Sequence, residues 1–172
     1  MLRIFWSSKR PMVRSAGIVS GVLWLCAVTA FAQANNPKCI RVNGFYNEQI
    51  VTNGCTSVIG LCTTYQYQGN LVADNFFRAA TIVPTSDTPF TGVVFATGKS
   101  ILTNVHIAGR RGTLTIKNAA VFHTTGDGEL LDVQTIVAGT GDLAGATGVI
   151  RTAGTFVNGV GRSIFDGQVC LP

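Results

Sequence analysis

The chain has 172 residues and a formal net charge of +5, from 13 Lys and Arg against 8 Asp and Glu. Four of the basic residues and none of the acidic ones lie within residues 1–32, which leaves nine basic and eight acidic residues in the remainder. A nearly neutral remainder gives no support to a nucleic-acid-binding protein or to one that binds an anionic membrane surface. We therefore expect neither partner.

Residues 1–32 have the features of a secretory signal peptide in the expected order. Four basic residues lie between positions 3 and 14, residues 16–29 are apolar and uncharged, and Ala30-Phe31-Ala32 matches a cleavage site. The apolar stretch is shorter than the roughly 20 residues that span a bilayer, and an uncleaved signal anchor is the alternative. We expect a secreted or periplasmic protein with no stable membrane insertion after cleavage.

Four cysteines follow residue 32, and an even number in an exported chain indicates two disulfides. Three pairings are possible. We favour Cys55 with Cys62, which closes a short loop, and Cys39 with Cys170, which ties together the two ends of the domain. A metal site would need closely spaced pairs such as C-x-x-C, and these are absent. We expect no metal and no cofactor.

The chain after residue 32 has the composition of short strands joined by tight turns, because it is rich in Gly, Thr, Val and Ile. Tyr65 and Tyr67 share one face of an alternating segment, and Asp132 and Gln134 alternate with apolar residues in a later one. One short helical turn could fall within residues 72–83. About eight such segments predict an all-β domain, either a sandwich or a closed barrel.

The segment from Val137 to Gly148 contains four glycines between two strand-like stretches. They are Gly139, Gly141, Gly145 and Gly148. The segment fits G-x-G-x-x-G/A, but a dinucleotide site needs a helix after the glycines, and the following residues alternate as a strand does. We interpret it as a structural turn in which glycine permits positive φ and close backbone contact. Asp142 is expected to cap its own backbone there.

No catalytic motif is visible in the sequence. The candidate carboxylates, Glu48, Asp74, Glu129, Asp132 and Asp142, have no paired spacing, and no nucleophile motif is present. Glu48 shares a strand face with Tyr46, as an interior polar site or as a contact at the rim, and we favour the rim. Asn104 and His106 share a face with Leu102; that face could line the interior, but a half-exposed position is favoured for His106.

Residues 135–150, T-I-V-A-G-T-G-D-L-A-G-A-T-G-V-I, resemble the late strand–turn–strand of the allene oxide cyclase barrel superfamily. That superfamily includes plant allene oxide cyclases, dirigent proteins and many uncharacterised bacterial secreted proteins. The matching features are the turn at Gly139 to Gly141, the small residues at Gly145 to Gly148, the upstream Gly112-Thr113-Leu114 and the final Gly167-Gln168-Val169. The resemblance covers residues 64–171, and its specific part is the turn itself.

The resemblance implies an eight-stranded antiparallel β-barrel with an interior cavity, often assembled as a homotrimer. Residues 33–63 would supply an N-terminal strand and a disulfide-bearing loop, and residues 64–172 the barrel, in one domain. The resemblance transfers no catalytic residue, because those of the plant proteins lie on earlier strands. The four cysteines also depart from the plant proteins.

Two functions remain open. The first is an exported barrel that binds a small apolar ligand in its lumen or acts as a scaffold. The alternative is an isomerase or cyclase that steers a reactive unsaturated intermediate, with Glu48, Asn104 and His106 as interior groups. An open lumen of roughly 300 Å³ or more with converging polar groups would favour the enzyme. A lumen filled by side chains would leave a scaffold.

Overall fold

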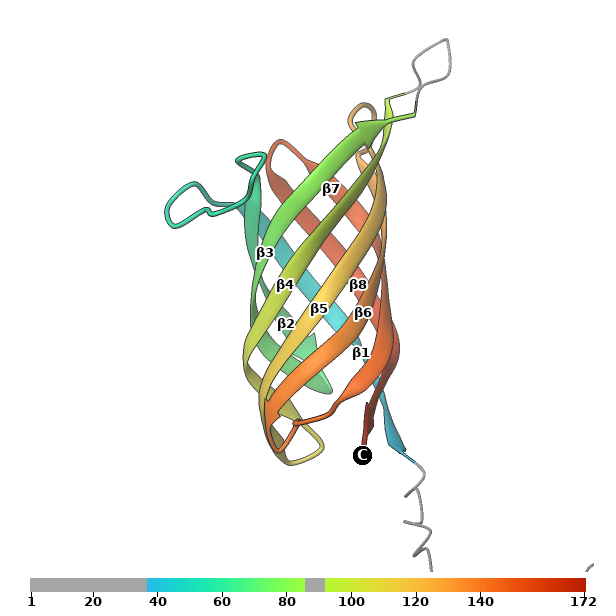
Figure 1. Ribbon diagram of the computed structural model, residues 1–172. Helices are drawn as coiled ribbons and strands as arrows, with labels where there is room; N and C mark the ends of the chain where they lie inside the picture. The colour runs from blue at the N-terminus through green and yellow to red at the C-terminus, as the bar shows by residue number, and fades with distance from the viewer. Residues whose placement is uncertain (1–36, 86–91) are drawn as a thin grey trace, which may run out of the picture. The chain divides into compact units, whose positions relative to one another are not determined.

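Eight antiparallel strands close into a barrel (Figure 1). The computed structural model describes residues 37–85 and 92–172, so the expected signal peptide at residues 1–32 lies outside the described residues. The strands are β1 (Lys38–Ile50), β2 (Cys62–Gly69), β3 (Leu71–Pro84), β4 (Val93–Ile107), β5 (Arg110–His123), β6 (Glu129–Gly141), β7 (Thr147–Val157) and β8 (Val160–Leu171). Each strand pairs with the next one in sequence, and β1 pairs with β8. The closure leaves no open edge among these eight strands.

The all-β prediction is confirmed, and of the two architectures left open by the alternation the closed barrel is the one observed. The expected helical turn within residues 72–83 is wrong, because those residues belong to the continuous strand β3. Cross-strand pairing to both β2 and β4 holds this segment extended. Within the described residues, no helix is long and apolar enough to cross a membrane.

One end of the barrel is closed by apolar side chains. This is the end that carries the β6–β7 connection and the C-terminal residue, at the bottom of Figure 1. Leu143, from the β6–β7 connection, is fully buried and packs in the core with Leu71, Ile107 and Leu171. The barrel is therefore plugged at this end by its own loop.

The glycine-rich segment makes this plug possible, and its interpretation as a structural turn is confirmed. Gly141 and Gly145 have φ of 62° and 75°, and a Cβ at Gly139 would lie 2.0 Å from the Leu143 carbonyl oxygen. The expected self-capping by Asp142 is wrong. Its Oδ2 accepts a hydrogen bond from the Arg111 backbone N–H at 3.2 Å, which joins the turn to the neighbouring hairpin.

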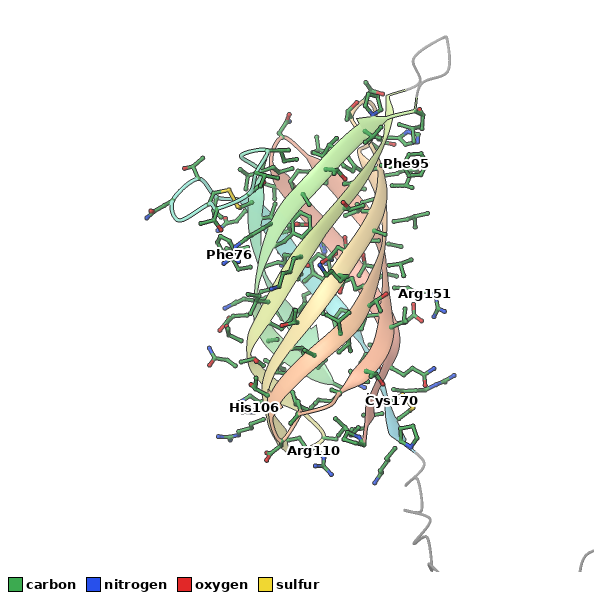
Figure 2. All side chains as sticks on the ribbon, viewed as in Figure 1. Phe76, Phe95, His106, Arg110, Arg151 and Cys170 are labelled. Carbon is green, nitrogen blue, oxygen red and sulfur yellow. A yellow bond between two sulfur atoms is a disulfide. The ribbon has the colours of Figure 1, made fainter. Side chains whose placement is uncertain are left out.

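Both favoured disulfide pairings are observed. Cys39–Cys170 joins β1 to β8 at the closed end, where Figure 2 labels Cys170, and Cys55–Cys62 closes the loop between β1 and β2. Disulfides persist in oxidising compartments and are rare in the reducing cytosol. The two bonds therefore indicate an extracellular or periplasmic environment.

Candidate functional site

The half of the barrel away from the plug has a polar interior. Its buried polar side chains come from all eight strands. They are Glu48, Thr63, Asn75, Ser100, Asn118, Asp132, Gln134, Thr152 and Ser163. Inward and outward positions alternate along each strand, and nearer the closed end most strands carry aliphatic side chains at the inward positions, such as Leu71, Ile116 and Ile150. The sequence thus divides one interior into an apolar part and a polar part.

All three tyrosines of the chain lie in the middle of this interior. Tyr46 stacks on Tyr65 with ring centroids 4.3 Å apart, and both rings contact Tyr67 at 5.4–5.5 Å. The edge of Phe165 meets Tyr67 at 4.9 Å. These stacked and tilted pairs are favourable aromatic arrangements. They fill the barrel between the apolar plug and the polar half, so the remaining space lies on one side of them.

A chain of hydrogen bonds fixes the acidic side chain of β6. Asp132 Oδ2 accepts hydrogen bonds from the Asn118 and Gln134 amides, each at 2.9 Å. The Tyr67 hydroxyl donates to Gln134 Oε1, which ties this network to the aromatic cluster. Two buried oxygens in the network, Asp132 Oδ1 and Asn118 Oδ1, have no hydrogen-bond partner within the described residues. Both are acceptors, so the network has capacity for a hydrogen-bond donor.

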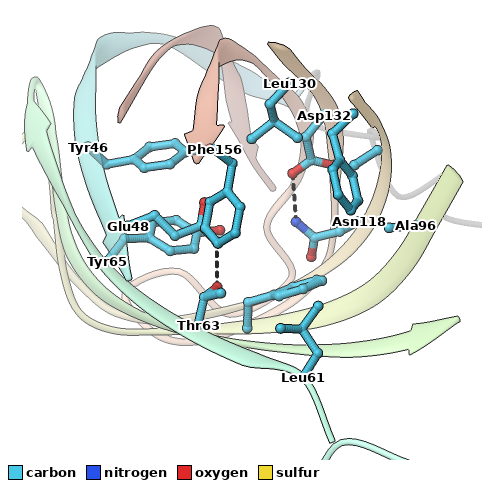
Figure 3. A pocket seen from close by; sticks show the side chains of 13 residues that line it. Tyr46, Glu48, Leu61, Thr63, Tyr65, Ala96, Asn118, Leu130, Asp132 and Phe156 are labelled. Carbon is cyan, nitrogen blue, oxygen red and sulfur yellow. Dashed lines mark hydrogen bonds between the residues drawn. The ribbon is translucent and has the colours of Figure 1, made fainter. Parts of the chain in front are cut away.

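Glu48 of β1 is the second carboxyl group in this space. Thr63 of β2 donates its hydroxyl proton to Glu48 Oε1, and this contact and the Asn118–Asp132 contact are the dashed lines in Figure 3. The two carboxyl groups thus approach the same cavity from different strands.

The cavity has a volume of about 70 Å³. Its lining includes buried polar groups and four half-buried apolar side chains, Leu61, Phe77, Phe122 and Phe156. Figure 3 labels Leu61 and Phe156 among them. This volume is far smaller than the 300 Å³ expected of an open ligand pocket, because side chains fill most of the lumen. The open lumen that would have favoured an enzyme is therefore not observed, and the interior has no room to enclose a whole ligand. This volume has room for a few waters or one small polar group.

Burial raises the pKa of both carboxyl groups. It raises the pKa of Glu48 to about 7, with a further upward contribution from the Asp132 charge, while the Thr63 hydrogen bond acts in the opposite direction. Burial also raises the pKa of Asp132, against the lowering effect of its two amide donors. Glu48 therefore exchanges a proton near neutral pH, which is the property required of a general acid or base.

The sequence candidates Glu48, Asn104 and His106 do not meet in the structure. Glu48 is in the interior, so the favoured rim position is wrong and the interior hypothesis is correct. Asn104 and His106 are exposed on the outer face, and His106 is labelled there in Figure 2. Their placement on the face of the buried Leu102 is wrong, because a bulge between Leu102 and Val105 reverses the alternation.

Asn104 sits in this bulge with φ of 51°, a left-handed conformation that asparagine tolerates. Its amide donates to Asp74 Oδ2 at 2.8 Å, and Gln66 donates to Asp74 Oδ1 at the same distance. Asn104 therefore stabilises the outer surface of β2, β3 and β4 and has no contact with the cavity.

Sequence reasoning missed Thr63 and Asn118 as residues of the site. It also did not show that Glu48 and Asp132 line the same cavity. The two carboxyl groups are 84 positions apart in sequence, and only the closure of the barrel brings β1 and β6 around one lumen. The sequence did show that Asp132 and Gln134 alternate with apolar residues and therefore share one strand face. Within the described residues, no group of three or more His, Cys, Asp or Glu side chains is placed to hold a metal ion.

Comparison with known proteins supports the fold alone. No protein-family model and no curated protein sequence matches the chain. A crystal structure of a protein of unknown function from the DUF3224 family, from Shewanella oneidensis, is similar with a TM-score of 0.50 and 18% sequence identity. The alignment covers 78% of this chain and 99% of that chain. The chain is thus a small β-barrel with a counterpart among solved structures.

Proposed function

We propose that the protein binds a small molecule through the polar end of its barrel. The main support is that two buried carboxyl groups, Glu48 and Asp132, line one cavity whose rim is aromatic and aliphatic. A cavity of about 70 Å³ accommodates a head group, and the half-buried rim provides an apolar surface for the rest of the molecule. The ligand class is therefore a compound with an apolar body and one small polar head.

The polar groups that line the cavity determine which ligand head group can bind. The carboxyl oxygens and the unpartnered Oδ1 of Asn118 are acceptors, so the matching head is a donor such as an amine or a hydroxyl. A carboxylate head would bring a third acidic group beside Glu48 and Asp132. That arrangement is unfavourable in a poorly solvated site.

A series of ligands with one body and different heads tests this proposal. We expect benzylamine and benzyl alcohol to bind saturably by ligand-observed NMR, and benzoate not to bind. The paired substitution Glu48→Gln and Asp132→Asn should weaken binding of the amine more than binding of the alcohol, because the ammonium group loses its charged partners. Equal binding of benzoate, or binding of none of the three, would contradict the proposal.

A second function, proton-transfer catalysis, is favoured by the position and protonation of Glu48. A buried carboxyl group with a pKa of about 7 is suited to move a proton within a bound unsaturated molecule. The resemblance to allene oxide cyclases and dirigent proteins is consistent with an isomerase or cyclase. Asn104 and His106 have no part in this version, because both lie on the outer face.

Native mass spectrometry of the protein purified from its own host distinguishes the two functions. A co-purifying compound that is recovered unchanged indicates a binding protein. A compound that the wild type isomerises, and that Glu48→Gln binds without changing, indicates the enzyme. A scaffold would carry no compound and would show none of the head-group selectivity described above.

The same sample tests export and assembly, which we propose on the signal sequence, the disulfides and the family resemblance. The expected mass is that of the chain without residues 1–32 and with two disulfides. The resemblance predicts a trimer of this mass. A full-length mass would contradict cleavage, and a monomer at all concentrations would contradict the trimer.

A further inference from the structure

Three basic side chains form a row across the outer surface of β3, β4 and β5. Arg78 pairs in register with Lys99, and Lys99 pairs with Lys117. Both lysines are exposed and Arg78 is half-buried. Like charges directly opposite each other on neighbouring strands repel. Such a row is therefore unfavourable unless something else in the molecule or its surroundings neutralises it.

The strand neighbours of the row do not neutralise it. Beyond Arg78 the next paired residue is Cys62 of β2, and beyond Lys117 it is Thr135 of β6. A groove of about 480 Å³ runs beside the three cations, and the described residues that line it include no Asp or Glu. Three of the nine basic residues that follow residue 32 thus gather in one place on a nearly neutral chain.

The guanidinium of Arg78 is held in place by an aromatic ring, but one of its hydrogen-bond donors has no partner within the described residues. Its carbon lies 5.1 Å from the ring centroid of Phe76, which Figure 2 labels on the side from which the Cys55–Cys62 loop projects. A cation over an aromatic ring is attracted to it. The Nε of Arg78 is buried and has no hydrogen-bond partner within the described residues. The group is fixed in orientation and retains a free donor.

The other wall of the groove is a loop with fixed geometry. Thr56, Ser57 and Val58 form this wall, inside the ring closed by the Cys55–Cys62 disulfide. Ser57 Oγ donates to the Ala79 carbonyl at 2.6 Å and accepts hydrogen bonds from two backbone N–H groups of the loop. The loop is therefore anchored to β3 next to Arg78, and the groove keeps its shape.

We propose that this groove binds a phosphomonoester group. Adjacent strands lie about 4.8 Å apart, so the outer two cations of the row are separated by roughly 10 Å at the backbone, and their long side chains can converge on one oxyanion between them. A dianion with three acceptor oxygens matches one planar guanidinium and two ammonium groups. The site lies on the outer face, so it is independent of the function proposed for the cavity.

Titration with inorganic phosphate and glycerol 2-phosphate at low ionic strength tests the proposal. We expect saturable binding by calorimetry, weakened at least about tenfold in the double variant Lys99→Gln and Lys117→Gln. The matched control removes two exposed cations elsewhere, Lys38→Gln and Arg162→Gln, and should bind as the wild type does. Equal weakening in both variants, or the absence of saturable binding to either compound and to the vesicles below, overturns the proposal.

A second measurement needs no variant. Phosphate-dependent amide shifts in the wild type should concentrate at residues 56–58, 78, 99 and 117, and a diffuse pattern or one centred elsewhere overturns the assignment. Vesicles of phosphatidylcholine with and without phosphatidic acid distinguish the source of the phosphate. Binding to the phosphatidic acid vesicles alone identifies a lipid headgroup, and binding to the dissolved compounds identifies a free phosphate ester.

Discussion

The two ends of the barrel use the same backbone for different purposes. At the closed end, inward positions carry Leu71, Ile107 and Leu171, and Leu143 folds back as a plug. At the open end, equivalent positions carry Glu48, Asp132 and their polar partners beneath a half-buried aromatic rim. The closed end stabilises the fold by burying apolar surface. The open end buries charge and leaves acceptors unpartnered, which is unfavourable for stability and is what a binding site requires.

The disulfide at the closed end should have the largest effect on stability. Cys39 and Cys170 are 131 residues apart, and in the chain-entropy model a bond across so long a loop contributes roughly 4–5 kcal/mol. We expect replacement of both cysteines by serine to lower the free energy of unfolding by this amount in urea denaturation. Replacing Cys55 and Cys62, which are 7 residues apart, should cost roughly 2–3 kcal/mol. A larger loss from the shorter loop would reverse the comparison.

The plug residue gives the next largest effect. Leu143→Ala should lower the free energy of unfolding by roughly 3–5 kcal/mol, because Leu143 is fully buried and its removal leaves a cavity between the ends of several strands. The matched substitution at the open end is Leu61→Ala. Leu61 is half-buried at the rim, so its truncation should cost roughly 1–2 kcal/mol. Equal losses in chemical denaturation would show that the closed end is not the better packed one.

The pH dependence of stability should show how much the burial of Glu48 at the open end destabilises the folded protein. The pKa of Glu48 is raised from 4.5 to about 7 in the folded protein. Below pH 4.5 the group is protonated in both states. As the pH rises to about 7, the unfolded chain releases this proton while the folded protein retains it. The free energy of unfolding therefore falls over this range, by roughly 3 kcal/mol, and levels off above it.

Glu48→Gln should flatten this pH profile, because the amide does not titrate and its carbonyl can still accept the Thr63 hydroxyl. Asp132 has a raised pKa as well, so Asp132→Asn should reduce the same slope. Asp74 provides the control of opposite sign. Hydrogen bonds from Asn104 and Gln66 lower its pKa, so its contribution is lost as the pH falls. An unchanged profile in Glu48→Gln would refute the assigned burial of this carboxyl group.

The sequence predicted most of the strands, both disulfides and, outside the bulged strand β4, the shared strand faces, but not which face points inward. Asp132 and Gln134 alternate with Leu131 and Val133, and the usual preference for apolar residues inside would bury the leucine. In the structure Leu131 is 62% exposed, while Asp132 and Gln134 are buried. The polar face can turn inward because Asn118 and Tyr67 supply hydrogen bonds from other strands. Such partners are distant in sequence, so no local pattern reveals them.

The bulge in β4 is the other feature that local periodicity in the sequence does not predict. A substitution beyond this bulge has the smallest expected effect on stability and binding. Two residues, Thr103 and Asn104, both face outward between Leu102 and Val105, so every later residue of the strand changes face. His106→Ala should therefore change the free energy of unfolding by no more than about 0.5 kcal/mol. It should also leave the affinity for benzylamine unchanged in the NMR titration. A loss of affinity would mean that His106 reaches the ligand, which the bulge forbids, and would place β4 one residue out of register.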